Sequence, residues 1–474
     1  MNFKKIRNSH LTGIKGVGMT ALALYFQDMG IMVSGSDVPE KFVTDEILKK
    51  RNIGWSVGIN SDHIKKGTEL LVTTGAHGGL NNDEVLKAKK LKIPVLTYAE
   101  ALAEVSYEKE TICVCGVGGK TTIGSMLSVL LDSANLSPSF VVGVGNISPL
   151  NISGRYIKDG RNFVCEADEY VLSPGIDNRP KFSLLKPKII IATNIEYDHP
   201  DVYENFDKTK EVFLQFFKKL PKYGYLIANA DNKNTLDVAT RSRVNLITYG
   251  FEKNVDYRIQ GLKFKDQKTL FSIYIRKSKK LIDNIVINVP GKFNAENAAA
   301  SLVAGDLLGI GHEEIKKGLQ RYLGCRRRFE DMGMFFGASF YDDYAHHPGE
   351  IKVTIQASKE WFPDRRIAVI FQPHTYSRTK ALFDEFSKSF SNADVVGLMD
   401  IYSSAREIYD PGVSSELLAK EIRKHQKNCH YLGDHKNTLS WIKENVRPGD
   451  VVLTMGAGDI FYLYDLLKNK DLSK

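Results

Sequence analysis

The residues best suited to chemistry in this sequence lie in one glycine-rich loop, Gly116-Val117-Gly118-Gly119-Lys120-Thr121-Thr122. The loop follows an apolar run typical of a strand and precedes a run typical of a helix, which is the context of a phosphate-binding loop. Small residues let backbone N–H groups point at phosphate oxygens, and the start of a helix adds positive potential. Lys120 can neutralise phosphate charge, and the Thr121 hydroxyl can ligate Mg²⁺. The complete motif has a glycine where Val114 stands, so we predict a shortened nucleotide-binding loop.

Two polar clusters follow other strand-like runs. Glu166-Ala167-Asp168-Glu169 comes directly after one run, and the segment from Asn194 to His199 comes after another. In open α/β sheets, ligands bind outside the carboxyl ends of the parallel strands. Glu166 could therefore hold Mg²⁺ opposite the phosphate loop, and His199 could be a second metal ligand. An ordinary acidic turn and a hydrogen-bonded loop histidine are the competing interpretations.

A second glycine motif lies near the start of the chain, where Gly16-Val17-Gly18-Met19-Thr20-Ala21 fits G-x-G-x-x-A. Asp37 follows about 20 residues later, as in the dinucleotide-binding fingerprint. This motif favours a different class of protein, an NAD-linked oxidoreductase. Physically, the motif indicates only that a diphosphate can bind at the start of a helix, and a UDP-sugar carries a diphosphate too. A tight turn that packs a strand on a helix is the third interpretation.

Three segments in the last third of the chain also carry polar or cationic groups. Asp342 to Pro348 and Phe371 to Arg378 each follow a strand-like run. His346 and His347 are adjacent and therefore point in different directions, and no third ligand accompanies them, so we predict no metal site there. Gly324 to Phe329 is basic and could contact phosphate, although a solvated run of charges explains it equally well.

These segments need a scaffold of alternating strands and helices to bring them together. Short apolar runs alternate with helix-like stretches along the whole chain, which is typical of parallel-sheet α/β domains. We predict an α/β protein with a Rossmann-like domain over residues 1–107, a central P-loop-type ATPase domain over 108–323 and a C-terminal α/β domain over 324–474. Residues 255–290 alternate apolar and polar side chains, which predicts antiparallel strands.

Composition limits the class of protein. The chain has 474 residues and a formal net charge of +9, and its basic residues are spread along the sequence. This distribution argues against a nucleic-acid partner and suits anionic small substrates. The five cysteines form no C-x-x-C pair, which fits a reducing compartment. No apolar run resembles a signal peptide or a membrane span, so we expect a cytoplasmic protein without a membrane partner.

The order of these motifs resembles that of the Mur ligases over essentially the whole chain. The segments that carry the resemblance are His10 to Ala23 (HLTGIKGVGMTALA), Val33 to Asp37, Gly119 to Thr122, Glu166 to Glu169, Thr193 to His199, Arg327 to Phe329, Asp342 to Glu350, FQPHTYSRT at 371–379 and Met455 to Ile460. Each is a modest signal alone, whereas their joint order is specific. The resemblance implies a cytoplasmic ligase of peptidoglycan synthesis, whose three domains bind a UDP moiety, ATP with Mg²⁺ or Mn²⁺, and an incoming amino acid.

The reaction that the resemblance implies joins L-alanine to the carboxylate of UDP-N-acetylmuramate. The carboxylate attacks the γ-phosphate and forms an acyl phosphate, which the amine of alanine then attacks to give an amide, ADP and phosphate. Lys120 and Mg²⁺ would offset the repulsion between a carboxylate and a triphosphate and stabilise the transferring phosphoryl group. The implied partners are these small molecules, with the protein a monomer or a weak homodimer.

The resemblance also assigns roles to individual residues. The catalytic residues would be Lys120, Glu166 and His199, and the metal ligands Thr121, Glu166 and His199. ATP would be held by the loop from Gly116 to Thr122 with Asn294, Asn297, Arg327 and Asp343. The UDP-sugar would contact Gly16, Gly18, Met19, Ser36, Asp37, His374 and Arg378.

Departures from the Mur pattern leave two alternatives within this class. Val117 and Gly118 stand where a threonine and a histidine are usual, so the loop lacks a hydroxyl and an imidazole, and a non-catalytic nucleotide-binding homologue is one alternative. Phe293 also stands where a histidine is usual, which changes the expected adenine contact.

The second alternative concerns the amine substrate. Tyr170 and the stretch DNRPKF at 177–182 resemble the family member that attaches a preformed tripeptide to the same UDP-sugar. FQPHTYSRT at 371–379 and the segment from Tyr402 to Glu407 resemble instead the member that adds alanine, and they favour L-alanine as the substrate.

Overall fold

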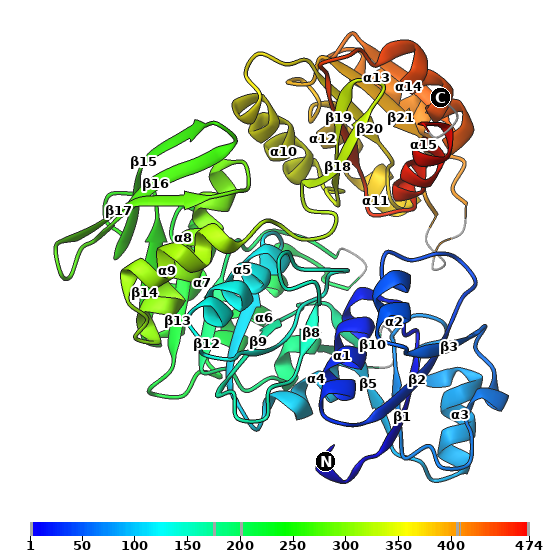
Figure 1. Cartoon of the computed structure of the whole chain (residues 1–474), viewed down its shortest axis with the longest axis vertical. Coiled ribbons are helices and arrows are strands. Elements are labelled where there is room, and N and C mark those ends of the chain that lie inside the picture. Colours follow the sequence, from blue (N-terminus) through cyan, green and yellow to red (C-terminus); the bar gives the residue numbers. More distant parts are fainter. Residues whose placement is uncertain (1–2, 174–176, 200–201, 404–406, 408, 472–474) are drawn as a thin grey trace. The chain divides into compact units, whose positions relative to one another are not determined.

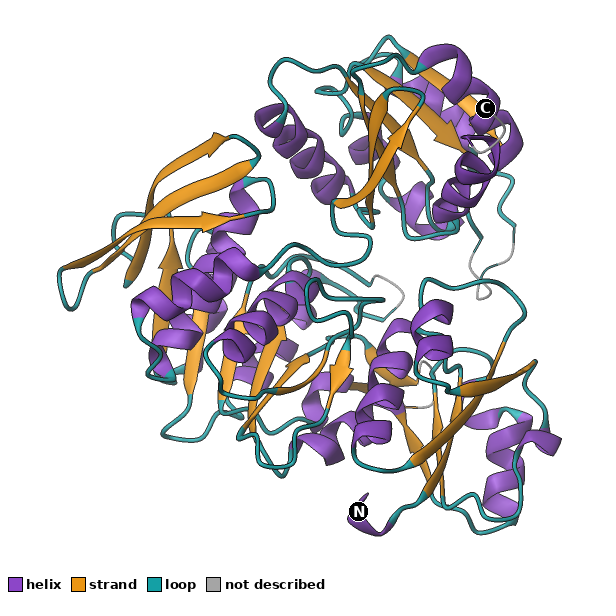
Figure 2. Cartoon of the chain, viewed as in Figure 1, coloured by secondary structure: helices purple, strands orange, loops and turns teal. Residues whose placement is uncertain are grey.

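The computed structural model describes residues 3–173, 177–199, 202–403, 407 and 409–471 (Figure 1). The segment from Tyr402 to Glu407 is only partly covered, because residues 404–406 lie outside the described ones. Helices and strands alternate along the chain, as Figure 2 shows in purple and orange. The chain divides into two compact units. The first contains Met1–Lys263, Leu270–Asn288 and Asn294–Arg326, and the second contains Phe264–Thr269, Val289–Phe293 and Arg327–Lys474.

The first unit begins with a five-stranded sheet in which every neighbouring pair is parallel. The strand order is β3 (Gly54–Val57), β2 (Met32–Asp37), β1 (Asn8–Thr12), β4 (Leu70–Thr73) and β5 (Val95–Thr97). The helices of this part are α1 (Val17–Asp28), α2 (Asp45–Lys50), α3 (Asp83–Lys90) and α4 (Tyr98–Ser106). From β1, the strand order runs through β2 and β3 toward one edge of the sheet and through β4 and β5 toward the other. This is the doubly wound pattern of nucleotide-binding folds. The predicted Rossmann-like fold of this part is confirmed.

A ten-stranded sheet forms the centre of the first unit. Its order is β17 (Lys280–Ile287), β16 (Lys268–Ile275), β15 (Tyr257–Lys265), β14 (Leu246–Gly250), β13 (Tyr225–Asn229), β12 (Ile189–Ala192), β6 (Glu110–Cys115), β9 (Asn162–Glu166), β7 (Ser139–Val141) and β8 (Gly154–Arg155). Neighbours from β15 to β7 pair in parallel. Its helices are α5 (Lys120–Ser133), α6 (Phe206–Phe217), α7 (Lys233–Ser242), α8 (Lys292–Leu307) and α9 (His312–Arg321). Residues Ile112 to Cys115 of β6 and all residues of β12 are apolar, which is typical of a parallel sheet whose two faces are both covered.

Strands β15 to β17 confirm the alternating pattern expected over residues 255–290. The turn between β15 and β16 is Asp266-Gln267, and both residues have positive φ, 51° and 52°. Two successive residues with positive φ are typical of the type I′ turn that joins two antiparallel strands in a hairpin. A separate antiparallel pair, β10 (Val171–Ser173) and β11 (Asp177–Pro180), follows the acidic segment after β9.

The second unit has a six-stranded sheet. The order is β18 (Glu330–Phe335), β19 (Ala338–Asp343), β23 (Val451–Met455), β20 (Ile367–Phe371), β21 (Val395–Met399) and β22 (Cys429–Gly433). Only β18 pairs antiparallel, with β19. Its helices are α10 (Pro348–Trp361), α11 (Tyr376–Ala381), α12 (Phe383–Ser387), α13 (Ser415–Ile422), α14 (His435–Asn445) and α15 (Leu463–Asp471). Separate apolar clusters include alternate residues of the central strands, so both faces of this sheet are packed.

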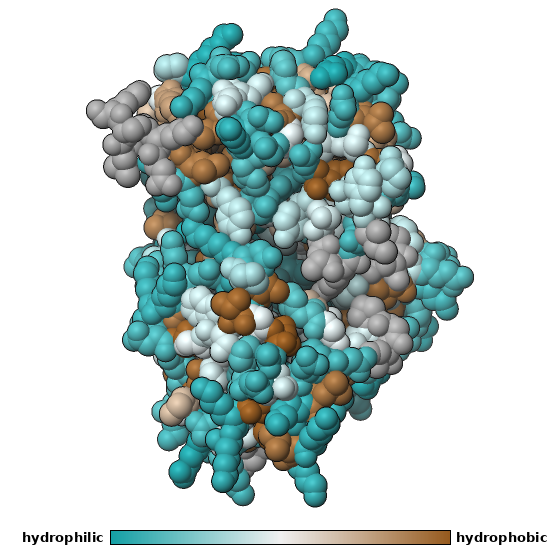
Figure 3. Space-filling model, turned by 90° about the vertical axis from the view of Figure 1, so that its right-hand side faces the viewer, coloured by the Kyte–Doolittle hydropathy of each residue, from teal (hydrophilic) through white to brown (hydrophobic). Residues whose placement is uncertain are grey.

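Short 3-10 helices complete the described structure. They are η1 (Phe3–Lys5), η2 (Ser61–His63), η3 (Gly79–Asn81), η4 (Lys181–Leu184) and η5 (Ile460–Tyr462). The face drawn in Figure 3 is mainly hydrophilic, with apolar residues in small separate groups. All five cysteines are free and buried. Among the described residues, no helix combines the length and the apolar character that crossing a membrane requires.

Candidate active site

The phosphate loop connects buried strand β6 to the start of helix α5, which is the predicted context. Gly116 and Gly119 have φ values of 123° and 85°, a region that favours glycine. A Cβ on Gly116 would lie 2.1 Å from Thr193 Oγ1, and one on Gly119 would lie 2.8 Å from Asn297 Oδ1. Glycine is therefore required at both positions for conformation and for space. The loop leaves the first N–H groups of α5 without helical partners, as anion binding at a helix start requires.

Lys120 lies at the start of α5 and is held in place by two oxygen groups. Its Nζ donates to the Gly116 carbonyl oxygen at 2.5 Å and forms an ion pair with Glu169 Oε2 at 3.2 Å. Burial lowers the pKa of Lys120, but the nearby carboxylates of Glu169, Asp168 and Glu166 raise it more, and the net shift is upward. The lysine is therefore a permanent positive charge beside the phosphate loop.

Thr121 and Glu166 meet as the sequence analysis expected. The Thr121 hydroxyl donates to Glu166 Oε2 at 3.1 Å, and the Gly143 N–H donates to Oε1 at 2.6 Å. A hydroxyl and a carboxylate this close supply two oxygen ligands of the kind that Mg²⁺ prefers. They meet because β6 and β9 are neighbours in the sheet, so the segments that follow them share one edge. These two residues fit the predicted metal role.

His199 lies with Glu169 and Asp198. Ligand atoms of these three residues all lie within 4.8 Å of one another, as a divalent cation would require. His199 Nε2 is 3.6 Å from a carboxylate oxygen of each. Burial lowers the pKa of His199, but Glu169 and Asp198 raise it more, so the net shift is upward. The resemblance paired His199 with Glu166, whereas the structure groups it with Glu169, a residue to which the sequence analysis gave no role.

Asp168 has a separate partner. Its Oδ2 forms an ion pair with Lys181 Nζ at 2.7 Å. Burial raises the pKa of this carboxyl, but Lys181 and then Lys120 lower it more, and the net shift is downward. Lys181 belongs to the DNRPKF stretch, so that stretch neutralises one of the carboxylates beside the phosphate loop.

The segment after β12 fixes the conformation of the phosphate loop. Val117 N–H donates to the Asn194 carbonyl oxygen at 2.9 Å, and Gly118 N–H donates to Asn194 Oδ1 at 2.8 Å. The Thr193 hydroxyl donates to the Gly118 carbonyl oxygen at 2.6 Å. A loop without the usual threonine and histidine is thus ordered by its neighbour in the sheet. Thr193 to His199 is one of the segments that carry the Mur resemblance, but that resemblance assigned no role to Asn194.

Asn294 and Asn297 lie on the first turns of α8. Both are buried, and Asn297 Nδ2 donates to Asn294 Oδ1 at 3.1 Å. The closeness of Asn297 to Gly119 places the start of α8 next to the phosphate loop. The structure thus brings Asn297 to the loop, while its predicted contact with the nucleotide stays a prediction.

The first glycine loop is ordered by the end of strand β2. Gly13 N–H and Ile14 N–H both donate to the Ser36 carbonyl oxygen, at 2.8 and 3.2 Å. Lys15 N–H donates to Asp37 Oδ2 at 2.7 Å. Burial raises the pKa of Asp37, although the N–H groups of Lys15 and Val38 and the charge of His77 act against the shift. Asp37 therefore shapes the loop, and its predicted contact with the UDP-sugar stays a prediction.

Of the remaining residues predicted for the UDP-sugar within the first unit, Gly16 directly precedes α1, Gly18 and Met19 lie on α1, and Ser36 lies on β2. A Cβ on Gly18 would lie 2.9 Å from the Tyr98 hydroxyl oxygen, so glycine is needed there for close packing. The side chains of Met19 and Ser36 are buried, at 4% and 0% exposure. Because the Ser36 hydroxyl donates to Glu84, it shapes the structure and does not face solvent.

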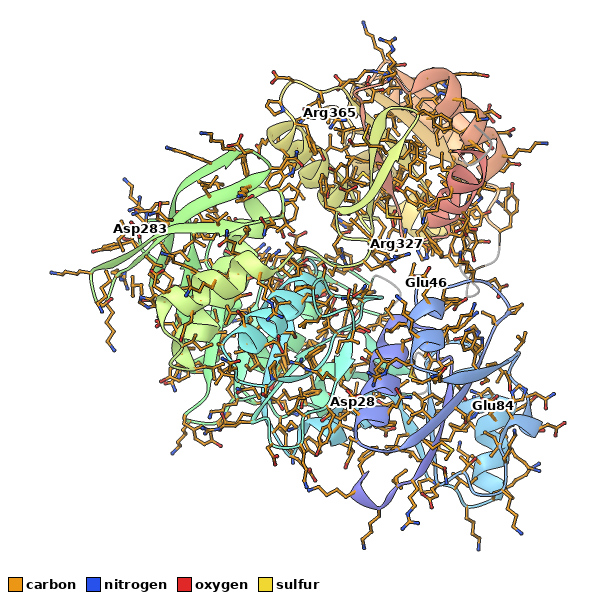
Figure 4. All side chains as sticks on the ribbon, in the orientation of Figure 1. Asp28, Glu46, Glu84, Asp283, Arg327 and Arg365 are labelled. Carbon is orange, nitrogen blue, oxygen red and sulfur yellow. The ribbon has the colours of Figure 1, made fainter. Side chains whose placement is uncertain are left out.

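Arg327 belongs to the second unit, where Figure 4 labels it. Its guanidinium pairs with Asp342, with Nε 2.9 Å from Oδ2, and donates to the carbonyl oxygens of Gly456 and Gly458 at 2.6 and 3.2 Å. The side chain is 7% exposed. Arg327 therefore ties the start of β18 to the loop after β23, and its predicted contact with ATP stays a prediction.

Among the other predicted residues of the second unit, Asp343 ends β19, His374 follows β20, and Arg378 lies on α11. Asp343 accepts from the N–H groups of Phe329 and Ala345, and burial raises its pKa to about 6. The His374 and Tyr402 rings stack with centroids 5.6 Å apart. Burial lowers the pKa of His346 to about 4; Glu350 acts against that shift, and the charge of Arg378 adds to it. His374 and Arg378 stay predictions as contacts of the substrate.

A phosphate loop beside carboxylates and a histidine, on the edge of a parallel sheet, defines a nucleotide-dependent enzyme of the α/β class. Three family models match the chain: the Mur ligase family catalytic domain over residues 8–109, the Mur ligase middle domain over 114–305, and the Mur ligase glutamate ligase domain over 327–458. The chain therefore belongs to the Mur ligase family, whose members are ATP-dependent, ADP-forming ligases, and it has their three-domain architecture.

Similar proteins extend over nearly the whole chain. A UDP-N-acetylmuramate–L-alanine ligase of Acetivibrio thermocellus is 38% identical over 472 residues, which cover 99% of this chain and 97% of the relative. One from Clostridium novyi is 38% identical over 465 residues, 97% of each chain. The crystal structure of the UDP-N-acetylmuramate–alanine ligase of Thermotoga maritima matches with a TM-score of 0.79 and 25% identity, over 98% of this chain and 99% of that one. A murein peptide ligase from Psychrobacter arcticus shares the fold, with a TM-score of 0.70 and 21% identity over 98% of both chains.

Proposed function

We propose that this protein joins L-alanine to the carboxylate of UDP-N-acetylmuramate and converts ATP to ADP and phosphate. The observation that carries the chemistry is the meeting of Lys120 and Thr121 with Glu166, Glu169 and His199 at one edge of the central sheet. The substrates come from the printed names of relatives that align over almost the full length. We further propose that the reaction takes place in the cytoplasm, where nucleotide-linked substrates occur, and that the protein acts as a monomer or weak homodimer.

The residues of the loop and its neighbours have distinct proposed tasks. Lys120 supplies a fixed positive charge where the γ-phosphate would lie, which favours attack by an anionic carboxylate. Thr121 and Glu166 would hold one Mg²⁺ or Mn²⁺, and His199 with its neighbouring carboxylates would hold a second. When bound, these cations would reduce the repulsion between the two anionic reactants. The first glycine loop, at the start of α1, would take the diphosphate of the UDP-sugar.

The test is a phosphate-release assay with ATP, Mg²⁺, UDP-N-acetylmuramate and L-alanine. We expect release that depends on both the UDP-sugar and the amino acid. Release with a tripeptide and not with alanine would reassign the amine substrate. The absence of release under every combination, with thermal protection by NAD and not by UDP, would overturn the proposal.

A further inference from the structure

A buried carboxylate lies against the strand ends that support the first glycine loop. Glu84, in the first turn of α3 and labelled in Figure 4, has no exposed surface. Its Oε2 accepts hydrogen bonds from the hydroxyls of Thr12 and Ser36, the latter at 2.7 Å. Thr12 is the last residue of β1, and Ser36 is the penultimate residue of β2. One carboxylate oxygen therefore ties together the ends of two neighbouring strands.

Groups from other elements complete the surroundings of Glu84. His63 Nδ1 in η2 lies 2.9 Å from Oε1, and His10 Nε2 on β1 lies 3.3 Å from Oε2. The Asn60 N–H donates to Oε1 at 3.4 Å. His10 Nε2 forms no hydrogen bond and meets Glu84 only as this ionic contact. The hydrogen bonds to Glu84 come from three elements and a loop, so they favour one arrangement of these parts.

Glu84 is ionised at neutral pH despite its burial. Burial raises its pKa, but His10 and the Thr12 hydroxyl lower it more, and the net pKa is about 2. A buried carboxylate without partners would instead favour its neutral form. The network is thus built around the charge and not only around the shape of the side chain.

The connection from Glu84 to the glycine loop is short. Ser36 donates its hydroxyl to Glu84, and its carbonyl oxygen accepts the N–H groups of Gly13 and Ile14. The next residue, Asp37, accepts the N–H of Lys15. Three consecutive N–H groups of the loop thus donate to two consecutive residues of β2, and Glu84 fixes the side chain of the first of these two residues.

We propose that Glu84 is a positioning residue for the UDP-sugar: it makes no contact with the substrate, and it sets the conformation of the loop that holds the diphosphate. This inference rests on the proposed function, in which the first domain binds the UDP moiety. A displacement of about 1 Å in a binding loop is enough to weaken binding strongly, because directed N–H groups lose their alignment. The phosphate loop lies in another sheet and is unaffected.

The first experiment uses Glu84→Gln in the full chain, with Glu69→Gln as the matched control. Glu69 accepts from the N–H groups of Arg7 and Asn8 at the opposite end of β1, away from the glycine loop. We expect Glu84→Gln to raise the KM for the UDP-sugar about tenfold and the Kd for UDP similarly, with the KM for ATP and kcat within about twofold of wild type. Glu69→Gln should leave all four values near those of wild type.

The second experiment is a double-variant cycle with Ser36→Ala. If Ser36 acts through Glu84, Ser36→Ala raises the Kd for UDP and the double variant binds UDP no more weakly than Glu84→Gln alone. Wild-type Kd values in both single variants would overturn the inference, and so would a uniform loss of kcat and of affinity for ATP. If Glu84→Gln does not fold, the Kd of Ser36→Ala for UDP alone tests the inference. Failure of the wild-type protein to bind UDP would count against the proposed function instead.

Discussion

At the residue scale, Lys120 is the side chain on which the chemical step depends most directly. Among the described residues, Lys120 is the only cation that contacts both the phosphate loop and Glu169, and Lys120→Ala removes it. We expect phosphate release to fall by about 10³-fold or more, because charge stabilisation of the transferring group is lost. The measurement is the substrate-dependent phosphate-release assay. Lys424→Ala, at an exposed pair with Glu421, should keep full activity, and a Lys120→Ala protein with near-normal turnover would show that the loop is misassigned.

Glu84 also makes a prediction about stability and pH. Its folded pKa is about 2 and the ordinary value is 4.5, so the carboxylate stabilises the folded protein at any pH above 4.5. This shift corresponds to roughly 3 kcal/mol. The contribution should disappear as the pH falls from 4.5 through about 2, since the folded state then binds the proton as well. Urea unfolding of wild type and Glu84→Gln at a series of pH values measures the difference, and a difference that does not change with pH would mean a neutral Glu84.

At the element scale, the turn between β6 and α5 depends on Gly116. A Cβ there would lie 2.1 Å from Thr193 Oγ1 and 2.9 Å from the backbone of Asn194, at a φ that side chains rarely adopt. We expect Gly116→Ala to displace the segment after β12 and to remove ATP-dependent activity, with a loss of about 2 kcal/mol or more in stability. Gly67→Ala is the matched control, because Gly67 also has a positive φ, 104°, and has open space around it. Calorimetric binding of an ATP analogue and thermal unfolding compare the two variants, and similar effects of both would contradict the steric argument.

The elements themselves were largely predictable from the sequence. The run from Ile112 to Cys115 is apolar and is bounded by a glycine loop, so its burial and its context could be predicted locally. The meeting of Thr121 with Glu166 was also predictable, because both follow strands of one parallel sheet.

The grouping of side chains was harder to predict. Glu169 and His199 meet only because β9 and β12 flank β6, and no local pattern gives that strand order. Glu84 follows Asn82 and Asp83 in a run that is typical of a helix start, where a glutamate is normally solvated. Its side chain is buried where it accepts hydrogen bonds from the ends of β1 and β2, a tertiary contact without a sequence signal.

At the scale of the whole molecule, the chain consists of two units with separate apolar clusters. We expect calorimetry to show two unfolding transitions. UDP should raise the midpoint temperature of the transition that belongs to the first unit and leave that of the other unchanged. The predicted domain boundaries at residues 107 and 323 stay predictions. A single transition that shifts as one with UDP would contradict independent units.

The variant Arg327→Ala identifies which unfolding transition belongs to the second unit. The substitution leaves Asp342, which is 2% exposed, without its cationic partner, and a broken buried pair costs about 3–5 kcal/mol. We expect the transition of the second unit to move to lower temperature while the other stays in place. Arg276→Ala in the first unit, at a pair with Asp256 that is largely exposed, should move neither transition measurably.

The ion pair between Lys120 and Glu169 has one more consequence. A triphosphate that binds Lys120 competes with Glu169 for the charge of the lysine, and Glu169 then lies beside Asp198 and His199 without the compensation that Lys120 provides. A divalent cation arriving with the nucleotide would supply that compensation. Binding of the nucleotide and binding of the cation are thereby coupled through one side chain. Removal of free metal by a chelator should therefore weaken ATP binding far more than the loss of phosphate shielding alone would explain.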